Sequence, residues 1–111
     1  MRPPRDVRRI DVRELRARFN STILPRVAAG ELVPTVKRGS HLQEERMGEQ
    51  PCTESQLVSY HDAAGTEVAR AHQYLRADGS IGGWGRPDPK VIYEGNIVYN
   101  VLPGEHAPGA G

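Results

Sequence analysis

The stretch Ile10–Ile23, with the sequence IDVRELRARFNSTI, carries the clearest local signal in this chain of 111 residues. Asp11 stands where an N-cap residue is expected, and Glu14 follows at the position that completes a capping box. Ile10 and Leu15 occupy the two positions of a hydrophobic staple. Spacings of three, four and four place four apolar residues on one helical face: Val12, Leu15, Phe19 and Ile23. The stretch therefore predicts an amphipathic helix.

The end of this helix is marked by Pro25, which lacks a backbone donor and predicts a stop or a kink. Residues 26–29 can add one further turn, and Gly30 suits a left-handed C-terminal cap. We therefore expect helix over about residues 12–24, with a short extension to about residue 29.

The second half of the chain changes to the period of β-strands. Residues 56–76 predict one hairpin across the turn at residues 62–65, and residues 91–101 predict another across residues 94–96. In the expected register Tyr60 pairs with Val68, and one strand face carries Ala69 and Ala71. Because alanines leave room for close packing, we expect the helix to cover that face. The predicted fold is α+β, a helix on an antiparallel sheet of about four strands.

The remaining segments complete one domain at residues 10–102. Pro34 confines a short extended segment at residues 32–36 to a sheet edge or excludes it from the sheet, and residues 37–39 predict a turn. The other segments lack apolar residues to bury and are expected to be a flexible basic arm (1–9), irregular loops (40–55 and 77–90) and a flexible tail (103–111).

Composition limits the class of protein. Hydrophobic residues make up 37% and charged residues 26% of the chain, which suits a modest globular core. The single cysteine, Cys52, excludes an intrachain disulfide and favours a reducing compartment. No apolar run reaches the roughly 18–20 residues of a membrane span. We therefore expect a cytoplasmic protein without membrane association.

The net charge of +1 conceals an uneven distribution. Through Arg38 the chain has ten Lys and Arg against four Asp and Glu, and from Gly39 onward five against ten. A basic head can contact nucleic acid, dock on an acidic body in a homodimer, or form a solvated helix face. The candidate phosphate contacts are Arg8, Arg9, Arg13, Arg16 and Arg18.

A second candidate site lies on the strand expected at residues 66–76. Alternation places Arg70, His72, Tyr74 and Arg76 on one face, about 6.6 Å from one to the next. A histidine between arginines fits metal-independent ribonuclease chemistry or phosphate binding. Long side chains covering apolar surface are the structural alternative, and the one we favour.

The 77–90 loop contains Trp84 and Arg86, which are candidates for contact with a partner. Its glycines do not form a phosphate-binding motif. The four histidines and Cys52 lack metal-ligand spacing, and Cys52 has no identifiable base beside it. We therefore expect neither a metal nor a cofactor.

Two segments resemble known families. Asp11–Arg16, Arg26–Glu31 and Lys37–Gly39 are similar to the N-terminal DNA-binding half of Phd/YefM-type antitoxins, over about residues 10–42. The match requires one extra residue at Pro25, and Pro34 falls where that family has a central strand. The resemblance implies a dimer on operator DNA that neutralises a ribonuclease toxin.

The other resemblance lies in the β half. The residues HQYLR at 72–76, Asp78-Gly79 and the run from Gly85 to Lys90 are similar to a motif, HQYLRxDG…GxPDPK, of small bacterial proteins of unassigned function. The sequence thus favours a bacterial, non-enzymatic binding module that contacts nucleic acid or a protein partner, within a toxin–antitoxin or regulatory pair. The alternatives are a ribonuclease using the 70–76 face and a purely structural or protein-interaction subunit.

Overall fold

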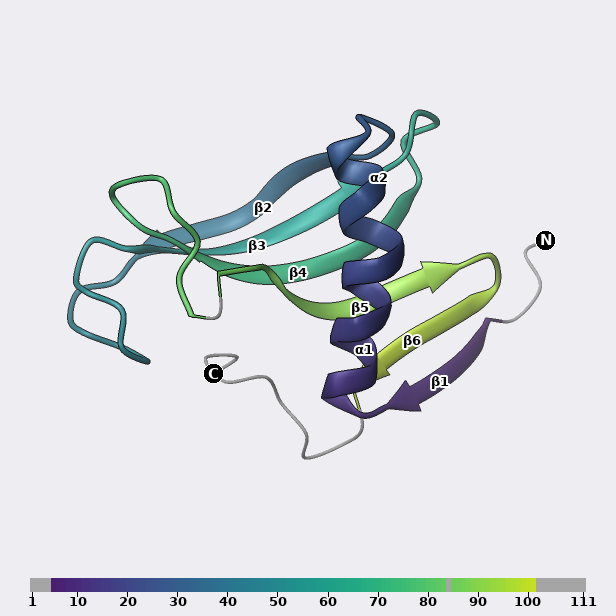
Figure 1. Ribbon diagram of the computed structural model, residues 1–111, viewed down its shortest axis with the longest axis horizontal. Coiled ribbons are helices and arrows are strands. Elements are labelled where there is room, and N and C mark those ends of the chain that lie inside the picture. Colours follow the sequence, from purple (N-terminus) through teal and green to yellow (C-terminus); the bar gives the residue numbers. More distant parts are fainter. Residues whose placement is uncertain (1–4, 84, 102–111) are drawn as a thin grey trace.

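The computed structural model describes residues 5–83 and 85–101, which form one helical segment packed on one sheet (Figure 1). The helical segment runs through α1 (Val12–Arg18), the π-helix η1 (Phe19–Ile23) and α2 (Leu24–Ala28). The strands are β1 (Asp6–Ile10), β2 (Val33–His41), β3 (Glu54–His61), β4 (Glu67–Leu75), β5 (Asp88–Glu94) and β6 (Ile97–Val101). Their order is β1-β6-β5-β4-β3-β2. The α+β class is confirmed, whereas the expectation of about four antiparallel strands is wrong. Within the described residues the sheet has six strands, and β1 runs parallel to β6.

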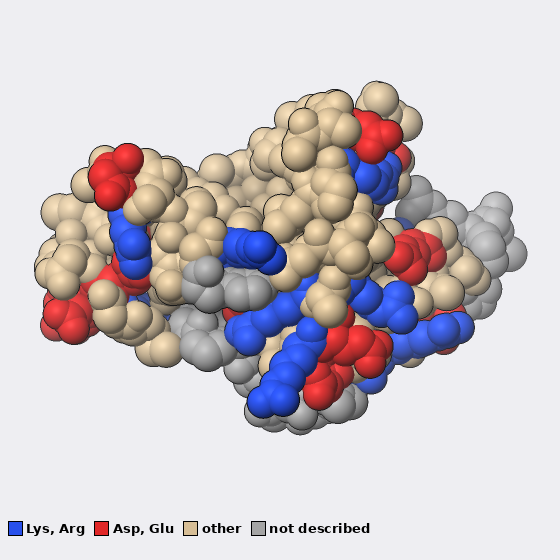
Figure 2. All heavy atoms as spheres, viewed as in Figure 1, with Lys and Arg blue, Asp and Glu red and all other residues tan. Residues whose placement is uncertain are grey.

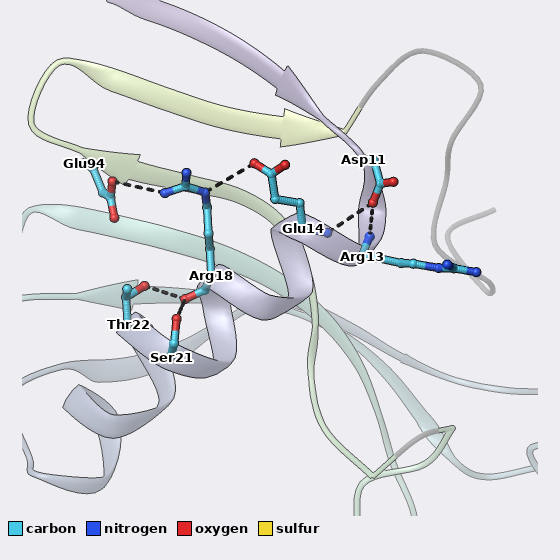
Figure 3. A network of polar contacts seen from close by, with 7 residues as sticks. All are labelled: Asp11, Arg13, Glu14, Arg18, Ser21, Thr22 and Glu94. Carbon is cyan, nitrogen blue, oxygen red and sulfur yellow. Dashed lines mark hydrogen bonds and ion pairs between the residues drawn. The ribbon is translucent and has the colours of Figure 1, made fainter.

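The helix begins where the sequence predicts. The carboxylate of Asp11 accepts the backbone N–H groups of Arg13 at 2.7 Å and Glu14 at 3.1 Å (Figure 3). The chain stays helical past Pro25, which has no backbone N–H to donate. The helix widens to a π-helix just before the proline, where the Leu24 N–H donates to the Phe19 carbonyl. Gly30, with φ of +77°, ends the segment in the left-handed conformation.

The core lies between this helical segment and the middle of the sheet. Leu15 and Phe19 are fully buried, and so are Ala69 and Ala71 of β4. The Phe19 ring meets the Tyr60 ring edge-on, with centroids 5.4 Å apart. The prediction that the helix covers the alanine face is therefore confirmed.

The partner strand β3 is shifted from its expected register. His61 pairs with Glu67 and Tyr60 with Ala69, so a bulge leaves Val68 without an opposite residue. The predicted pairing of Tyr60 with Val68 is wrong by one residue, and a one-residue slip exchanges the faces of a strand. As a result Val58 and Tyr60, only 2% and 3% exposed, face the helix beside the alanines.

The two additional strands are longer than the sequence indicated: β1 comes from the expected arm, and β2 from a short extended segment, a turn and the start of a loop. Residues 6–9 of the expected arm belong to β1, whose first residue bonds to Asn96 in the β5–β6 turn at 2.8 Å. The expected turn at 37–39 is a bulge within β2, which pairs with β3 along its full length. Of the two outcomes that Pro34 allowed, an edge strand or exclusion from the sheet, the structure has the edge strand. Residues 1–4 and the expected tail at 103–111 lie outside the described residues. No helix in the described part of the chain is long and apolar enough to cross a membrane.

Candidate functional site

The strand face that carries Arg70, His72, Tyr74 and Arg76, the alternative ribonuclease site, is divided by ion pairs. Arg70 lies 2.9 Å from the Glu67 carboxylate, and Arg76 lies 2.9 Å from that of Glu49. His72 and Tyr74 do lie together, with ring centroids 4.7 Å apart. Both arginines are thus bound to carboxylates on either side of the aromatic pair, and the four residues do not converge on one phosphate.

His72 is held within the sheet. Its Nε2 lies 2.7 Å from the Ser55 hydroxyl on β3, and its backbone pairs with Leu57 and Asp88. Burial lowers the pKa of His72 below its ordinary 6.5, and the positive charges of Lys90 and Arg46 lower it further while Asp88 opposes them. The neutral imidazole is therefore favoured, and cations outweigh anions around it.

A pocket of about 260 Å³ opens beside the C-terminal end of β4, at residues 72–74. It is lined by residues 72–74 of β4 together with residues of α1, of the loop after β2 and of the segment between β4 and β5. The other lining residues are Arg16, Met47, Gly82, Gly83, Arg86 and Asp88. The fold thus brings residues from four separate segments of the sequence to one cavity.

Asp88 is the acidic group of this pocket. It is 8% exposed, and its carboxylate lies 2.9 Å from Arg16 Nε and 3.8 Å from Lys90 Nζ. Burial lowers the pKa of Lys90, an effect that Asp88 opposes. One carboxylate is therefore shared by two cations.

The wall of the pocket is fixed by an arrangement that we call the Glu49 clamp, made of Glu49, Arg76 and Gly83. The Glu49 side chain, 4% exposed, accepts bonds from Arg76 Nε at 2.9 Å, Arg76 Nη2 at 3.0 Å and the Gly83 N–H at 2.8 Å. These bonds lower the pKa of Glu49, with Arg76 contributing most. A Cβ on neighbouring Gly82 would lie 2.1 Å from the Glu49 carboxylate, so only glycine fits there. The sequence did not reveal Glu49 as a residue of this site. The feature in the sequence that is connected with it is the Gly82-Gly83 pair, which leaves room for the Glu49 carboxylate.

The candidate phosphate-binding arginines are in different environments. Arg16 binds Asp88. Arg18 lies 3.6 Å from Glu14 and 3.9 Å from Glu94 (Figure 3). The Arg18 guanidinium also lies over the Tyr99 ring. Arg8 bonds to Asp6 at 2.9 Å. Arg9 and Arg13 are exposed, and the Arg13 side chain extends away from the helix in Figure 3. Figure 2 shows acidic and basic side chains interleaved along this face. Three of the five arginines, Arg8, Arg16 and Arg18, are therefore paired with carboxylates of the same chain.

The edge strand β2 is a second exposed feature. All nine of its residues are exposed, including Val33 at 60% and Val36 at 48%. Among the strands that the structure describes, it pairs with β3 alone, and Figure 1 shows it as the last strand at one edge of the sheet. An edge of this length offers unpaired backbone groups to another chain.

The remaining candidates add no catalytic centre. Trp84 lies outside the described residues, whereas Arg86 lines the pocket. Cys52 is exposed in the loop before β3. Within residues 5–83 and 85–101, no three His, Cys, Asp or Glu side chains are grouped so that they could hold a metal ion.

Comparisons with family models, with curated proteins and with solved structures gave no match. The resemblances to an antitoxin segment and to small bacterial proteins therefore stay predictions, and the function has to be argued from this chain alone.

Proposed function

We propose that this chain is a non-enzymatic binding module whose partner is a protein that adds an extended, acidic segment to β2. The observation that carries the proposal is the exposure of all nine residues of β2 along the sheet edge. Strand addition uses backbone hydrogen bonds for affinity and alternate side chains for specificity. A setting within a toxin–antitoxin or regulatory pair is compatible with such a module.

The side chains of β2 support an acidic occupant. The strand carries Lys37 and Arg38 and contains no acidic residue. Exposed Val33 and Val36 offer apolar contacts next to these charges. A segment that alternates acidic and apolar residues would match both properties.

Two features of β2 restrict which strands can pair with it. Pro34 has no N–H to donate, and the bulge between Val36 and Arg38 interrupts the regular ladder. Prolines, bulges and lysines are the features by which exposed sheet edges avoid non-specific aggregation. An exposed edge with these restrictions fits a partner of defined register better than a second copy, which would also bring Lys37 and Arg38 close to their own like charges.

Nucleic acid is the other partner class that the sequence favours, and it has less structural support. Arg16, Arg18 and Arg8 each form an ion pair with a carboxylate of the same chain: Asp88, Glu14 and Asp6, respectively. The ribonuclease alternative is weakened further, because Arg70 and Arg76 are paired with Glu67 and Glu49.

The test is a titration with a synthetic peptide of alternating Glu and Val, followed by NMR and by amide hydrogen exchange. We expect saturable shifts and slower exchange confined to β2 and β3, and no binding of the matching Lys-Val peptide. Reversing charge at Lys37 and Arg38 should weaken binding about tenfold or more, whereas the control Arg13→Glu should not.

Other outcomes would overturn the proposal. One is binding of a DNA or RNA oligonucleotide without peptide binding, with a salt dependence that flattens on neutralising Arg9 and Arg13. Another is a homodimer in sedimentation that protects the β2 amides, which would make a second copy the occupant. Unchanged β2 amides at millimolar peptide would also refute it.

A further inference from the structure

We propose that β1 is a self-association edge, which pairs antiparallel with β1 of a second copy of this chain across a two-fold axis at Val7. The proposal does not depend on the partner of β2, because β1 lies at the opposite edge of the sheet (Figure 1). Of the described strands, β1 pairs only with β6, and that pairing runs through all five residues without a bulge. Its outer edge is therefore a regular row of backbone groups.

The outward backbone groups of β1 belong to Val7 and Arg9. The Asp6 N–H donates to the Asn96 carbonyl at 2.8 Å, so the backbone groups of Asp6 point toward β6. Because these groups alternate in direction along a strand, those of Val7 and Arg9 point away from β6. Two Val7 residues that lie opposite each other can thus exchange both N–H···O=C bonds, as in the hydrogen-bonded pairs of an antiparallel ladder. This pairing leaves the β1–β6 ladder intact.

The side chains of β1 complement themselves in this register. Asp6 lies opposite Arg8 of the second copy, and Arg8 lies opposite Asp6 of the second copy. Both side chains are exposed on the same side of the strand, where Arg8 Nη2 bonds to the Asp6 carboxylate at 2.9 Å. The two-fold axis turns the two ion pairs into a square of alternating charges, and opposite charges directly across a strand pair are stabilising. Val7, 53% exposed, meets its own copy at the axis.

Charge also selects this register over its neighbours. An axis at Arg8 would set two arginines against each other and would use backbone groups that already point toward β6. The register with its axis at Val7 does place Arg9 opposite Arg5 of the second copy. The Arg5 guanidinium, however, lies over the Tyr93 ring on β5, with its central carbon 4.7 Å from the ring centre, and so extends away from the edge.

The length of the edge sets the strength of the dimer. Five residues a side are far fewer than the roughly 20–30 of a standard interface, so we expect a Kd of roughly 10 µM to 1 mM. The dimer is one continuous sheet with a β2 strand at each outer edge. It therefore presents the β2 edge twice.

The first test is sedimentation equilibrium of the full chain, combined with amide hydrogen exchange, from about 10 µM to 1 mM. We expect the average mass to rise toward that of a dimer and exchange to slow at Val7 and Arg9, with the β2 amides unchanged. Val7→Pro removes an outward N–H without removing a bond to β6, and it should abolish the dimer. A monomer at about 1 mM, or a dimer that protects β2 instead of β1, would overturn the proposal.

The second test uses two charge variants that should fail alone and succeed together. Asp6→Arg sets arginines against arginines across the axis, and Arg8→Asp sets aspartates against aspartates, so each should raise the Kd about tenfold or more. An equimolar mixture should restore the dimer, because every arginine of one variant then faces an aspartate of the other. Arg13→Asp makes the same charge change at an exposed helix position and should leave the Kd unchanged. A mixture that stays monomeric where the wild type dimerises would refute the register.

Discussion

Glu49→Gln should unfold more easily than the wild type, because the Glu49 clamp joins the loop after β2 to the loop before β5. The substitution keeps the size of the side chain but replaces a carboxylate oxygen with an amide donor that faces the Arg76 guanidinium. Hydrogen bonds to charged groups contribute about 1.5–3 kcal/mol each. Since the Arg76 side chain is 44% exposed and can be rehydrated, we take the lower end, a loss of about 1.5 kcal/mol. For a domain of this size that lowers Tm by roughly 6–12 °C.

The clamp also has a defined pH dependence. Its bonds lower the pKa of Glu49 in the folded state below the ordinary value of 4.5. The stabilisation is therefore complete above that value and is lost as the pH falls through the folded-state pKa. The difference in the free energy of unfolding between wild type and Glu49→Gln should be largest at pH 7 and should shrink below about pH 4.

Urea denaturation at pH 7 and at several acidic pH values measures both effects. Glu45→Gln, an exposed residue of the same loop, is the matched control and should stay within about 0.5 kcal/mol of wild type. Gly82→Ala should act like Glu49→Gln, because its Cβ would meet the Glu49 carboxylate. If Glu49→Gln is as stable as Glu45→Gln, or if its deficit does not change with pH, the reasoning is refuted.

Three further predictions concern the core, the helix start and the pocket. Phe19→Ala should cost about 3–5 kcal/mol in chemical denaturation, because the ring is fully buried against Tyr60; a loss below about 1 kcal/mol would contradict that packing. Asp11→Ala should cost about 1 kcal/mol through the lost N-cap bonds, with Asp11→Asn retaining most of the stability. The His72 ring should titrate by NMR below its ordinary pKa of 6.5, and stability should fall as the pH drops from 6.5 through that midpoint; a midpoint at or above 6.5 would contradict the burial of the ring and its cationic surroundings.

Local residue types were sufficient to predict much of the fold. The helix start depends on Asp11 and on apolar spacing within one segment, and the two hairpin turns depend on a few adjacent residues. The face of β4 that packs under the helix follows from the small size of Ala69 and Ala71. Such features need no knowledge of distant contacts, because the groups that interact are close in sequence.

The strand register could not be obtained in the same way. The turn at residues 62–65 is compatible with more than one pairing, and the bulge at Val68 is favoured because it buries Val58 and Tyr60 under the helix. The strands β1 and β2 likewise form by pairing with β6 and β3, and their own residues are mostly exposed. An exposed segment of mixed composition has no periodic signal that distinguishes an edge strand from a loop.

The candidate site shows the same division between sequence and tertiary structure. The sequence identified His72, Tyr74 and Arg86 as candidates for catalysis or for contact with a partner, and these three residues line the pocket. It also grouped Arg70 and Arg76 with His72, because alternation along a strand gives the face of a residue but not its partners. Arg70 pairs with Glu67, three residues earlier on the same strand, whereas Arg76 pairs with Glu49, which lies in a loop that only the fold brings alongside. The sequence by itself determined the helix, the two hairpins and which residues carry charge, whereas the tertiary structure decided which charges neutralise one another, since ion pairing depends on distances that exist only after folding.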